Sequence, residues 1–329
     1  SRGCAWTVHH SPMGVVGLIT PWNFPAAMIA KKLSAAIAAG CPAVIRPSSK
    51  TPLSMIALCQ LLHEVVELPA GRVNLVTGPP DPIGAVLCGH PDVRAISFTG
   101  STDIGRALVR QCADGIKRLT LELGGNAPFL VFEDADLAAA ADQLILNKFR
   151  GGGQTCVCAN RILVQRKVAG SFAGLLQERV AGLRLGNGIE DSTDIGPLID
   201  RRAHDKVRRH LDDALERGAT LVTPSRPEPA SGDWGCFFPP TIVRGVTPEM
   251  ACWQEETFGP LVPLAEFDSE EEALTLANDT EFGLAGYFFT ADSDRAERLT
   301  LGLECAHVGH NTGTGPTPEA PFGGMKHSG

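Results

Sequence analysis

The sequence predicts an α/β protein with two parts, a doubly wound parallel-sheet domain followed by a second α/β domain. Two observations carry this prediction. Short β-branched runs alternate with helical segments from Val15 onward, which is typical of a parallel sheet with helices on its faces. The 329 residues, 43% of them hydrophobic, also give room for two cores.

The first part reads as alternating strands and helices. Strands are predicted at 15–20, 42–45, 73–76 and 95–99. Helices are predicted at 26–40, 54–66 and 83–88, with another beginning at Arg106. The first two strands end in the polar loops 21–25 and 46–52. Because ligands of such sheets bind beyond the carboxyl ends of the strands, we expect a ligand site at these loops.

A glycine-containing turn, Gly100-Ser101-Thr102-Asp103-Ile104-Gly105, follows the strand at 95–99. Glycine at such a turn lets phosphate oxygens approach backbone N–H groups at the positive end of a helix. The turn differs from the usual three-glycine dinucleotide fingerprint, and many strand-to-helix turns contain glycine without binding anything. Taken alone, the motif leaves both interpretations open.

Glu122 is a carboxylate inside the apolar run 119–125. Burial there would raise its pKa towards the range that is useful for a general base. The alternative is a carboxylate at a sheet edge that reaches water, and the residues alone favour neither.

Three glycines at 151–153 precede the cysteines Cys156 and Cys158. Glycine suits backbone that passes close to a ligand or adopts positive φ. Cys156 is therefore a candidate nucleophile, which requires a base and an oxyanion donor elsewhere in the chain. The alternative is one small buried hydrophobe among ten cysteines.

The second part continues as α/β. Asp134 and Asp136 are expected to cap a helix that runs towards Arg150, a strand is predicted at 161–165, and the Pro/Gly/Ser-rich piece 224–235 is a predicted surface loop. The remaining predicted elements are helices at 169–185, 201–217 and 270–277 and a strand at 286–289. The mixed charges of the helix at 201–217 are interpreted as a solvated face.

Composition and charge argue against several classes of function. The net charge of −8 and the lack of a Lys/Arg-rich run argue against nucleic acid as a partner. No apolar stretch has the length of a membrane span, and the first residues do not read as a signal peptide. Ten cysteines scattered through apolar segments indicate reduced thiols in the cytoplasm. No CxxC pair or Cys/His cluster predicts a metal site.

Five motifs stand in order along nearly the whole chain. They are Pro-Trp-Asn-Phe-Pro at 21–25, Leu-Glu-Leu-Gly-Gly at 121–125, Gly-Gln-Thr-Cys at 153–156, Glu-Thr-Phe-Gly-Pro at 256–260 and Pro-Phe-Gly-Gly at 321–324. Together they closely resemble the NAD(P)-dependent aldehyde dehydrogenase superfamily.

The resemblance implies a covalent mechanism. The Cys156 thiolate would attack an aldehyde carbonyl, and the Asn23 amide and the Cys156 backbone N–H would hold the oxyanion of the thiohemiacetal. Hydride would leave to a nicotinamide, and water activated by Glu122 would hydrolyse the resulting thioester.

The resemblance also implies a cofactor site. Glu256 and Phe258 match the positions that hold the nicotinamide ribose and contact the nicotinamide. The remaining cofactor positions implied by the resemblance are Trp22, Arg46, Ser49, Gly100, Ser101, Gly105 and Leu123.

Ser49 stands where NAD-preferring members often carry glutamate, and Lys50 follows it. A carboxylate there would bind the ribose hydroxyls and repel a 2′-phosphate, so its absence favours NADP over NAD. Arg46 replaces a common lysine and preserves a cation near the ribose.

Within the superfamily, Phe149-Arg150 and residues 156–160 and 278–285 look like those of succinate-semialdehyde dehydrogenases. In that subfamily an arginine at the Arg150 position clamps the carboxylate of the substrate. Lys31 stands where a second clamping arginine is usual, and Pro316 where a substrate-binding serine is usual. Lysine keeps the charge without the fork of arginine, so weaker carboxylate binding or a different substrate is expected.

Cys158 matches the second cysteine of a redox switch in that subfamily, where it forms a reversible disulfide with the nucleophile. The alternative is a packed thiol.

The resemblance does not cover the whole length of the family's chains, which carry a segment before the point matching Val15 and a strand after Gly329. We therefore expect an N-terminally incomplete cofactor-binding domain at 1–123, a catalytic domain at 124–308 and a return segment towards the cofactor domain at 309–329. A homo-oligomer is expected from the family, but the absence of both ends puts it in question.

Three functions stay open at this point. The first is oxidation of a short carboxylate-bearing aldehyde, such as succinate semialdehyde, with reduction of NADP or NAD. The second is a catalytically silent fragment or binding protein that keeps the motifs. The third is a thiol hydrolase or acyltransferase that uses Cys156 without hydride transfer, which Glu256, Phe258 and the glycine turn disfavour.

Overall fold

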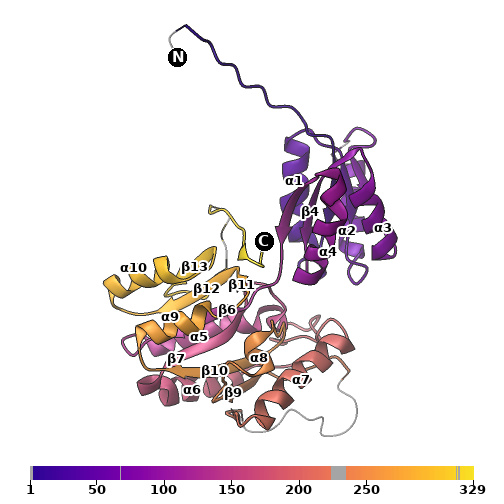
Figure 1. Cartoon of the computed structure of the whole chain (residues 1–329). Helices are drawn as coiled ribbons and strands as arrows, with labels where there is room; N and C mark the ends of the chain where they lie inside the picture. The colour runs from indigo at the N-terminus through magenta and orange to yellow at the C-terminus, as the bar shows by residue number, and fades with distance from the viewer. Residues whose placement is uncertain (1–2, 67, 224–234, 316, 318) are drawn as a thin grey trace. The chain divides into compact units, whose positions relative to one another are not determined.

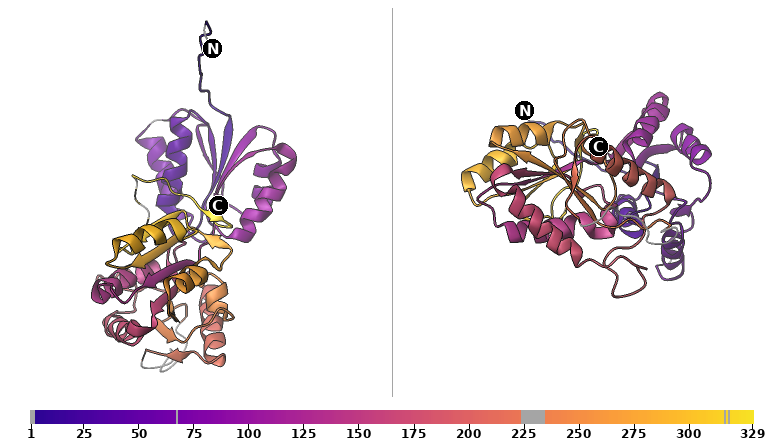
Figure 2. Two further views of the ribbon diagram at one scale, coloured as in Figure 1. Left: turned by 60° about the vertical axis from the view of Figure 1, so that its left-hand side comes forward. Right: turned by 90° about the horizontal axis from the view of Figure 1, so that it is seen from below.

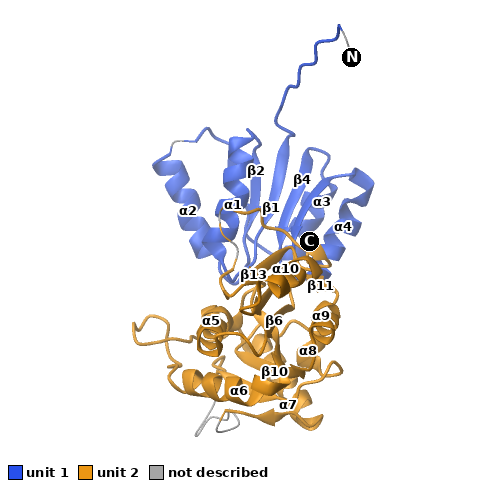
Figure 3. Cartoon of the chain, turned by 90° about the vertical axis from the view of Figure 1, so that its left-hand side faces the viewer, with its two compact units in different colours: residues 1–122 blue, residues 123–329 orange. Residues whose placement is uncertain are grey.

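The computed structural model describes residues 3–66, 68–223, 235–315, 317 and 319–329 (Figure 1). The chain divides into two compact units, Ser1–Glu122 and Leu123–Gly329, which are described separately (Figure 3). Cofactor binding by the first part, a catalytic domain at 124–308 and a return segment at 309–329 stay predictions.

Unit 1 is a parallel sheet of five strands in the order β3-β2-β1-β4-β5. The strands are β1 Val15–Ile19, β2 Ala43–Arg46, β3 Val73–Leu75, β4 Val93–Thr99 and β5 Arg118–Glu122. The helices are α1 Pro25–Ala38, α2 Leu53–Glu64, α3 Pro80–Gly89 and α4 Thr102–Cys112, followed by the 3₁₀ turn Ala113–Gly115. Helices lie on both sides of the sheet (Figures 2 and 3). The predicted doubly wound sheet is confirmed.

The strand order reverses at β1, which has β2 on one side and β4 on the other. In doubly wound sheets, ligands bind beyond the carboxyl ends of the strands at such a reversal. The core beneath it is apolar, since Leu18 of β1, Ile45 of β2 and Ile29 of α1 are buried. Packing therefore fixes the strands whose ends carry the predicted loops.

Unit 2 contains a seven-stranded sheet in the order β13-β12-β6-β7-β10-β9-β8, in which only the β8–β9 pair is antiparallel, and a separate β11–β14 pair. Its strands are β6 Ala127–Val131, β7 Ala159–Gln165, β8 Thr220–Leu221, β9 Thr241–Arg244, β10 Leu261–Phe267, β11 Phe282–Gly283, β12 Ala285–Phe289, β13 His307–His310 and β14 Met325–Lys326. Its helices are α5 Leu137–Phe149, α6 Arg166–Ala181, α7 Arg201–Glu216, α8 Ala251–Gln254, α9 Glu270–Asn278 and α10 Ser293–Gly302, with a 3₁₀ turn at Arg150–Gly153.

The sheet of unit 2 has an apolar layer on each face. Successive side chains of a strand point to opposite faces, so Phe129 and Val131 of β6 pack in the layer that contains α5 and α6 residues. Leu130 packs in the opposite layer, which contains residues of α7 and α10. The two buried faces explain why β6 and β10 are almost wholly apolar.

Several local predictions differ from the structure. Asp136 caps α5, whereas Asp134 accepts hydrogen bonds from residues 290–292 and is not a cap. Strand β6 was not predicted, because Pro128 argues against a central strand; the register shift between Ala127 and Pro128 accommodates it. Helix α3 begins at Pro80, since proline fits the first turn of a helix. Helix α4 begins at Thr102 and not at Arg106, so the predicted position of Gly105 in a turn is wrong.

Some predictions fall outside the described residues, namely most of the loop at 224–235 and the substitution at Pro316. Among the helices that the structure does describe, none is both long and apolar enough to cross a membrane.

Candidate active site

Four buried polar atoms of unit 1 have no hydrogen-bond partner among the described residues, and all four lie at carboxyl ends of strands. They are Thr20 Oγ1 after β1, Arg46 Nε of β2, Thr99 Oγ1 of β4 and Glu122 Oε2 of β5. Buried polar atoms are nearly always hydrogen-bonded in folded proteins. This edge of the sheet therefore fits a polar ligand that would supply the missing partners.

The two predicted polar loops contact each other at this edge. Thr51 Oγ1 donates a hydrogen bond to the Trp22 carbonyl at 3.4 Å, and Lys50 Nζ lies 5.8 Å from the centre of the Trp22 ring. Arg46 donates to Ser49 Oγ at 3.4 Å. Asn23 lies in the same loop as Trp22, two residues before α1 begins. Unit 1 thus brings these predicted cofactor residues to one edge.

The glycine turn leads directly into α4. Ser101 is the residue before the helix, and its side chain makes no capping hydrogen bond. Gly100 N–H donates to the Glu122 carbonyl at 3.0 Å, which ties the turn to β5. A helix start without a side-chain cap suits a phosphate group, because backbone N–H groups and the helix dipole both favour an anion.

Gly105 lies inside α4 and not in the turn before it, where it was predicted. It lies in the first turn of α4, is buried, and donates its N–H to the Ser101 carbonyl at 3.0 Å. Because this N–H already bonds within the helix, Gly105 does not form part of the open turn. Gly100 and Ser101 are the residues of the motif that lie before the helix.

Glu122 is half-buried at the end of β5. Burial raises the pKa of its carboxyl group to about 7, an effect that the nearby Lys32 and Lys31 charges oppose. Lys32 itself donates to Ser97 Oγ at 2.9 Å, and burial lowers its pKa to about 8. A carboxylate with a pKa near neutrality suits a general base.

The glycine run adopts the backbone conformation that glycine permits. Gly151, Gly152 and Gly153 have φ values of 58°, 67° and 77°. At Gly153 a side chain would also collide with the Gly259 carbonyl. The run therefore needs glycine for both its conformation and its close approach to the segment after Phe258.

The turn that carries Cys156 is held from β12 and α5. Tyr287, buried on β12, donates its hydroxyl to the Val157 carbonyl at 2.8 Å. Asn147 of α5 accepts the Ala159 N–H at 2.6 Å. Two side chains from other elements thus fix the backbone on the carboxyl side of the half-buried Cys156.

Cys158 is buried beside the same turn. Its thiol lies 3.6 Å from the Lys148 carbonyl and 3.5 Å from that of Ala159, as a donor to both. Burial raises the pKa of this thiol. These contacts are those of a packed thiol, and a redox role for Cys158 stays a prediction.

Three of the motifs meet at Gly125 within unit 2. Gly125 N–H donates to Glu256 Oε1 at 3.0 Å. A side chain at Gly125 would collide with the Cys156 carbonyl. The backbone at Gly125 therefore passes between Cys156 and Glu256, and only glycine fits there. Leu123, two residues earlier, is buried.

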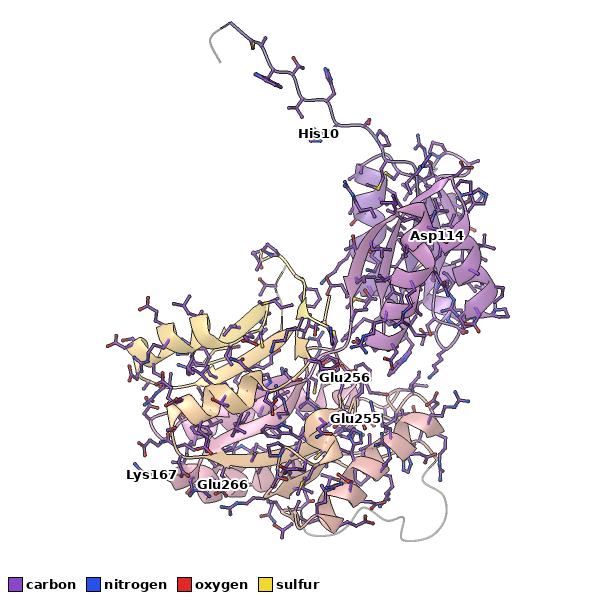
Figure 4. All side chains as sticks on the ribbon, viewed as in Figure 1. His10, Asp114, Lys167, Glu255, Glu256 and Glu266 are labelled. Carbon is purple, nitrogen blue, oxygen red and sulfur yellow. The ribbon has the colours of Figure 1, made fainter. Side chains whose placement is uncertain are left out.

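Glu256 and Phe258 lie on the segment that follows α8, and Figure 4 labels Glu256 and its neighbour Glu255 there. Burial raises the pKa of the Glu256 carboxyl group to about 7, which the Gly125 N–H and the charges of Lys206 and Lys148 oppose. Phe258 has a φ of 57°, a value that is uncommon outside glycine.

The two predicted substrate residues are exposed, Lys31 on α1 in unit 1 and Arg150 at the start of the 3₁₀ turn in unit 2. Their role at a substrate carboxylate stays a prediction.

Sequence reasoning missed several residues that hold the site. Tyr287 is the only tyrosine in the chain, a signal that was present in the composition. The helix at 201–217 was interpreted as a solvated face, which is wrong for one side of α7. On that side Lys206 donates to the Glu256 carbonyl and His210 is fully buried. Charge pattern alone does not distinguish these residues from the exposed ones.

Comparisons with known proteins agree on one family. A model of the aldehyde dehydrogenase family matches residues 2–329. A 3-sulfolactaldehyde dehydrogenase of Pseudomonas putida is 51% identical over 322 residues, covering 98% of this chain and 65% of that protein. A succinate-semialdehyde dehydrogenase (NADP+) of Escherichia coli is 50% identical over 318 residues, covering 97% of this chain and 65% of that protein.

Solved structures share the fold. An oxidoreductase from Marinobacter aquaeolei has a TM-score of 0.96 at 62% identity, covering 99% of this chain and 67% of that one. A succinate-semialdehyde dehydrogenase from Burkholderia pseudomallei has a TM-score of 0.94 at 50% identity, with coverages of 97% and 65%. The chain thus spans slightly less than two thirds of the length of the curated relatives described above.

Proposed function

This chain belongs to the aldehyde dehydrogenase family, and we propose that it oxidises a short aldehyde with an anionic tail to the acid, with reduction of NADP or NAD. The observation that carries the proposal is the meeting at Gly125 of the Cys156 turn and Glu256. A nucleophile beside a residue expected to bind the nicotinamide ribose is what a covalent dehydrogenase requires.

Cys156 is the proposed nucleophile. Its thiolate sulfur forms a bond to the aldehyde carbon, and the carbonyl oxygen becomes an oxyanion. The Asn23 amide and the Cys156 backbone N–H are the proposed donors to that oxyanion, because neutral N–H donors stabilise it without losing a proton themselves.

Glu122 is the proposed base for hydrolysis of the thioester. Its carboxylate removes a proton from water as the water oxygen attacks the acyl carbon, and the Cys156 thiolate leaves. A pKa of about 7 keeps a useful fraction ionised at neutral pH while leaving the carboxylate basic enough to take the proton.

The residues at the carboxyl edge of unit 1 fit a nicotinamide dinucleotide. Arg46 and Ser49 would hold the adenosine ribose, Gly100 and Ser101 before α4 would hold the pyrophosphate, and the unpaired Thr99 hydroxyl lies at the same edge. When bound, the nicotinamide supplies the hydride acceptor. Lys50 beside Ser49 favours NADP, and the relatives include proteins named for NADP dependence.

An anionic tail is the proposed substrate feature. Relatives near 50% identity are named for succinate semialdehyde, glutarate semialdehyde and 3-sulfolactaldehyde, which all carry a carboxylate or sulfonate. Arg150 is the proposed clamp because a guanidinium binds such groups with two parallel hydrogen bonds. Lys31 is the proposed second cation.

The alternative is a catalytically silent family member. Such a protein would keep the motifs and the fold without turnover.

Turnover separates the two functions. Purified chain is mixed with succinate semialdehyde and NADP, and NADPH formation is followed at 340 nm, an absorbance of the reduced nicotinamide itself. The proposal expects turnover that Cys156→Ala abolishes and that Cys305→Ala, a change at another partly buried thiol, leaves within about twofold. No turnover with this or any other anionic aldehyde and either nucleotide would support the silent alternative.

A further inference from the structure

Helix α7 holds the segment that carries Glu256 and Phe258. His210, Lys206 and Arg209 all point from α7 to residues 255–257. His210 is fully buried, on the same side of the helix as Val207 and Leu211. One face of α7 therefore contacts the apolar layer and the proposed cofactor segment together.

The His210 ring bridges two residues of this segment. Its Nδ1 lies 3.1 Å from Thr257 Oγ1, and its Nε2 lies 3.1 Å from Glu255 Oε2. The Glu255 carboxylate can only accept, so Nε2 carries the proton and Nδ1 accepts the Thr257 hydroxyl. Burial keeps the ring neutral by lowering the pKa of His210 to about 4, which agrees with this tautomer.

Glu255 is fixed in turn by Arg209. The guanidinium donates to both carboxylate oxygens, at 3.2 and 2.8 Å. The hydrogen bonds from Arg209 and His210 lower the pKa of Glu255 to about 2, so the carboxylate is ionised at all ordinary pH values. The Glu255 carboxylate can therefore always accept the hydrogen bond from His210 Nε2.

Asn160 of β7 also holds the segment. Its Oδ1 accepts the Thr257 N–H at 3.1 Å, and its Nδ2 donates to the Glu255 carbonyl at 3.0 Å. Thr257 is thus bound through its backbone by a strand and through its side chain by a helix. These bonds restrain Thr257 and, with it, its neighbours Glu256 and Phe258.

The backbone conformation of Phe258 explains why residues 255–258 need this support. Its φ of 57° is a left-handed conformation that a side chain other than glycine rarely adopts. Conformations of this kind persist only where the surrounding structure enforces them. The bonds to Thr257, one residue earlier, provide that enforcement.

We propose that His210 is a positioning residue that fixes residues 255–258 through Thr257 and Glu255 and thereby sets nucleotide affinity without acting on the Cys156 thiol. The inference rests on the proposed function, because Glu256 and Phe258 are assigned to the nucleotide there.

The test uses the full chain and His210→Phe, which keeps a ring and removes both hydrogen bonds. Amide hydrogen exchange is measured on the peptide that covers 255–259, and the Kd for NADP by titration. We expect faster exchange and a Kd raised about tenfold, the effect of losing one or two hydrogen bonds. Cleavage of 4-nitrophenyl acetate without nucleotide, which reports the thiol alone, should stay within about twofold.

Matched variants separate positioning from a general loss of structure. His204→Phe changes a histidine that lies on the same helix and packs on Phe238, and it should leave the exchange and the Kd unchanged. His210→Gln, which retains one donor and one acceptor, should recover part of the affinity. If His210→Phe does not fold, Thr257→Val removes the same bond from the other side and should raise the Kd in the same direction.

The outcomes are distinguishable. Unchanged exchange at 255–259, or a Kd equal to that of the wild type, overturns the inference and leaves the proposed function standing. Equal effects of His204→Phe and His210→Phe also overturn it. A wild-type chain that binds neither NADP nor NAD overturns the proposed function and the claim on affinity together, and exchange at 255–259 then decides the structural claim alone.

Discussion

Gly125 donates its backbone N–H to Glu256 Oε1 at 3.0 Å, and its Cα faces the carbonyl of Cys156 so closely that no side chain fits between them. Gly125 and Glu256 lie 131 positions apart in the sequence. The contact brings the nucleophile turn and the segment of Glu256 against one glycine. The proposed chemistry therefore depends on a residue that has no side chain.

Substituting Gly125→Ala should abolish turnover, because the new Cβ displaces the Cys156 carbonyl and the nucleophile with it. Steady-state NADPH formation measures the effect, expected as a loss of about 100-fold or more, since misplacement of about 1 Å has that cost. Gly174→Ala in α6 is the matched control, because open space surrounds that position. It should retain activity and gain about 0.5–1 kcal/mol of stability. An active Gly125→Ala variant would contradict the role given to this glycine.

The rate of thioester hydrolysis should rise with pH through about 7. Glu122 accepts a proton only as the carboxylate, and its pKa of about 7 sets the midpoint. Rapid mixing at a series of pH values, with NADPH followed after the first turnover, measures this step. In Glu122→Gln the phase after the first turnover should be lost at every pH, so that one NADPH forms per active chain. Full multiple turnover in Glu122→Gln would contradict the assignment.

The ionisation of Glu256 should weaken the fold between about pH 4.5 and 7. Its pKa is raised in the folded chain from 4.5 to about 7, so in this window the native state binds more protons than the unfolded state. The free energy of unfolding therefore falls as pH increases. Urea unfolding gives the free energy of unfolding of wild type and of Glu256→Gln at each pH. The wild-type value minus the variant value should decrease as the pH rises across this window. A difference that rises with pH would contradict the shift.

Removing the Tyr287 hydroxyl in Tyr287→Phe should destabilise unit 2 by about 1–3 kcal/mol, because the Val157 carbonyl loses its bond in a partly buried place. Denaturant unfolding measures the loss. The rate at which iodoacetamide alkylates Cys156, followed by peptide mass spectrometry, should change as well, since Val157 is the next residue. Phe289→Leu, in the same strand and without a polar contact to the turn, should alter stability and leave the alkylation rate unchanged. Equal alkylation rates in Tyr287→Phe and wild type would show that the hydroxyl does not position the thiol.

Arg150→Met should raise the KM for succinate semialdehyde by about tenfold or more, because it removes a two-bond clamp on a carboxylate. The kcat should change little if the clamp acts equally in the ground and transition states. An uncharged short aldehyde such as propanal is the matched substrate, and its KM should not change. Equal effects on both aldehydes would remove Arg150 from substrate recognition.

Sequence patterns predicted the repeating architecture well, because β-branched runs and helical spacing report burial directly. They failed where one residue had an unusual context. Pro128 concealed the central strand β6, and Gly105 was placed in a turn because glycine inside the first turn of a helix gives no separate signal.

The candidate site was also predicted only in part. Cys156, Glu122 and Glu256 were predicted as candidates from motifs, whereas the residues that hold them were not. His210 and Tyr287 act through contacts between segments far apart in the sequence, and Asn147 acts through a contact 12 positions away. A single sequence gives no information on such pairs, since a buried histidine and an exposed one look alike on a charged helix.

The most direct measurement of the central claim is the intact mass of Glu122→Gln after mixing with succinate semialdehyde and NADP, followed by peptide mapping. We expect a succinyl group bound as a thioester to the peptide that contains Cys156, formed only when nucleotide is present. An unmodified chain, or a succinyl group on any other residue, would contradict it.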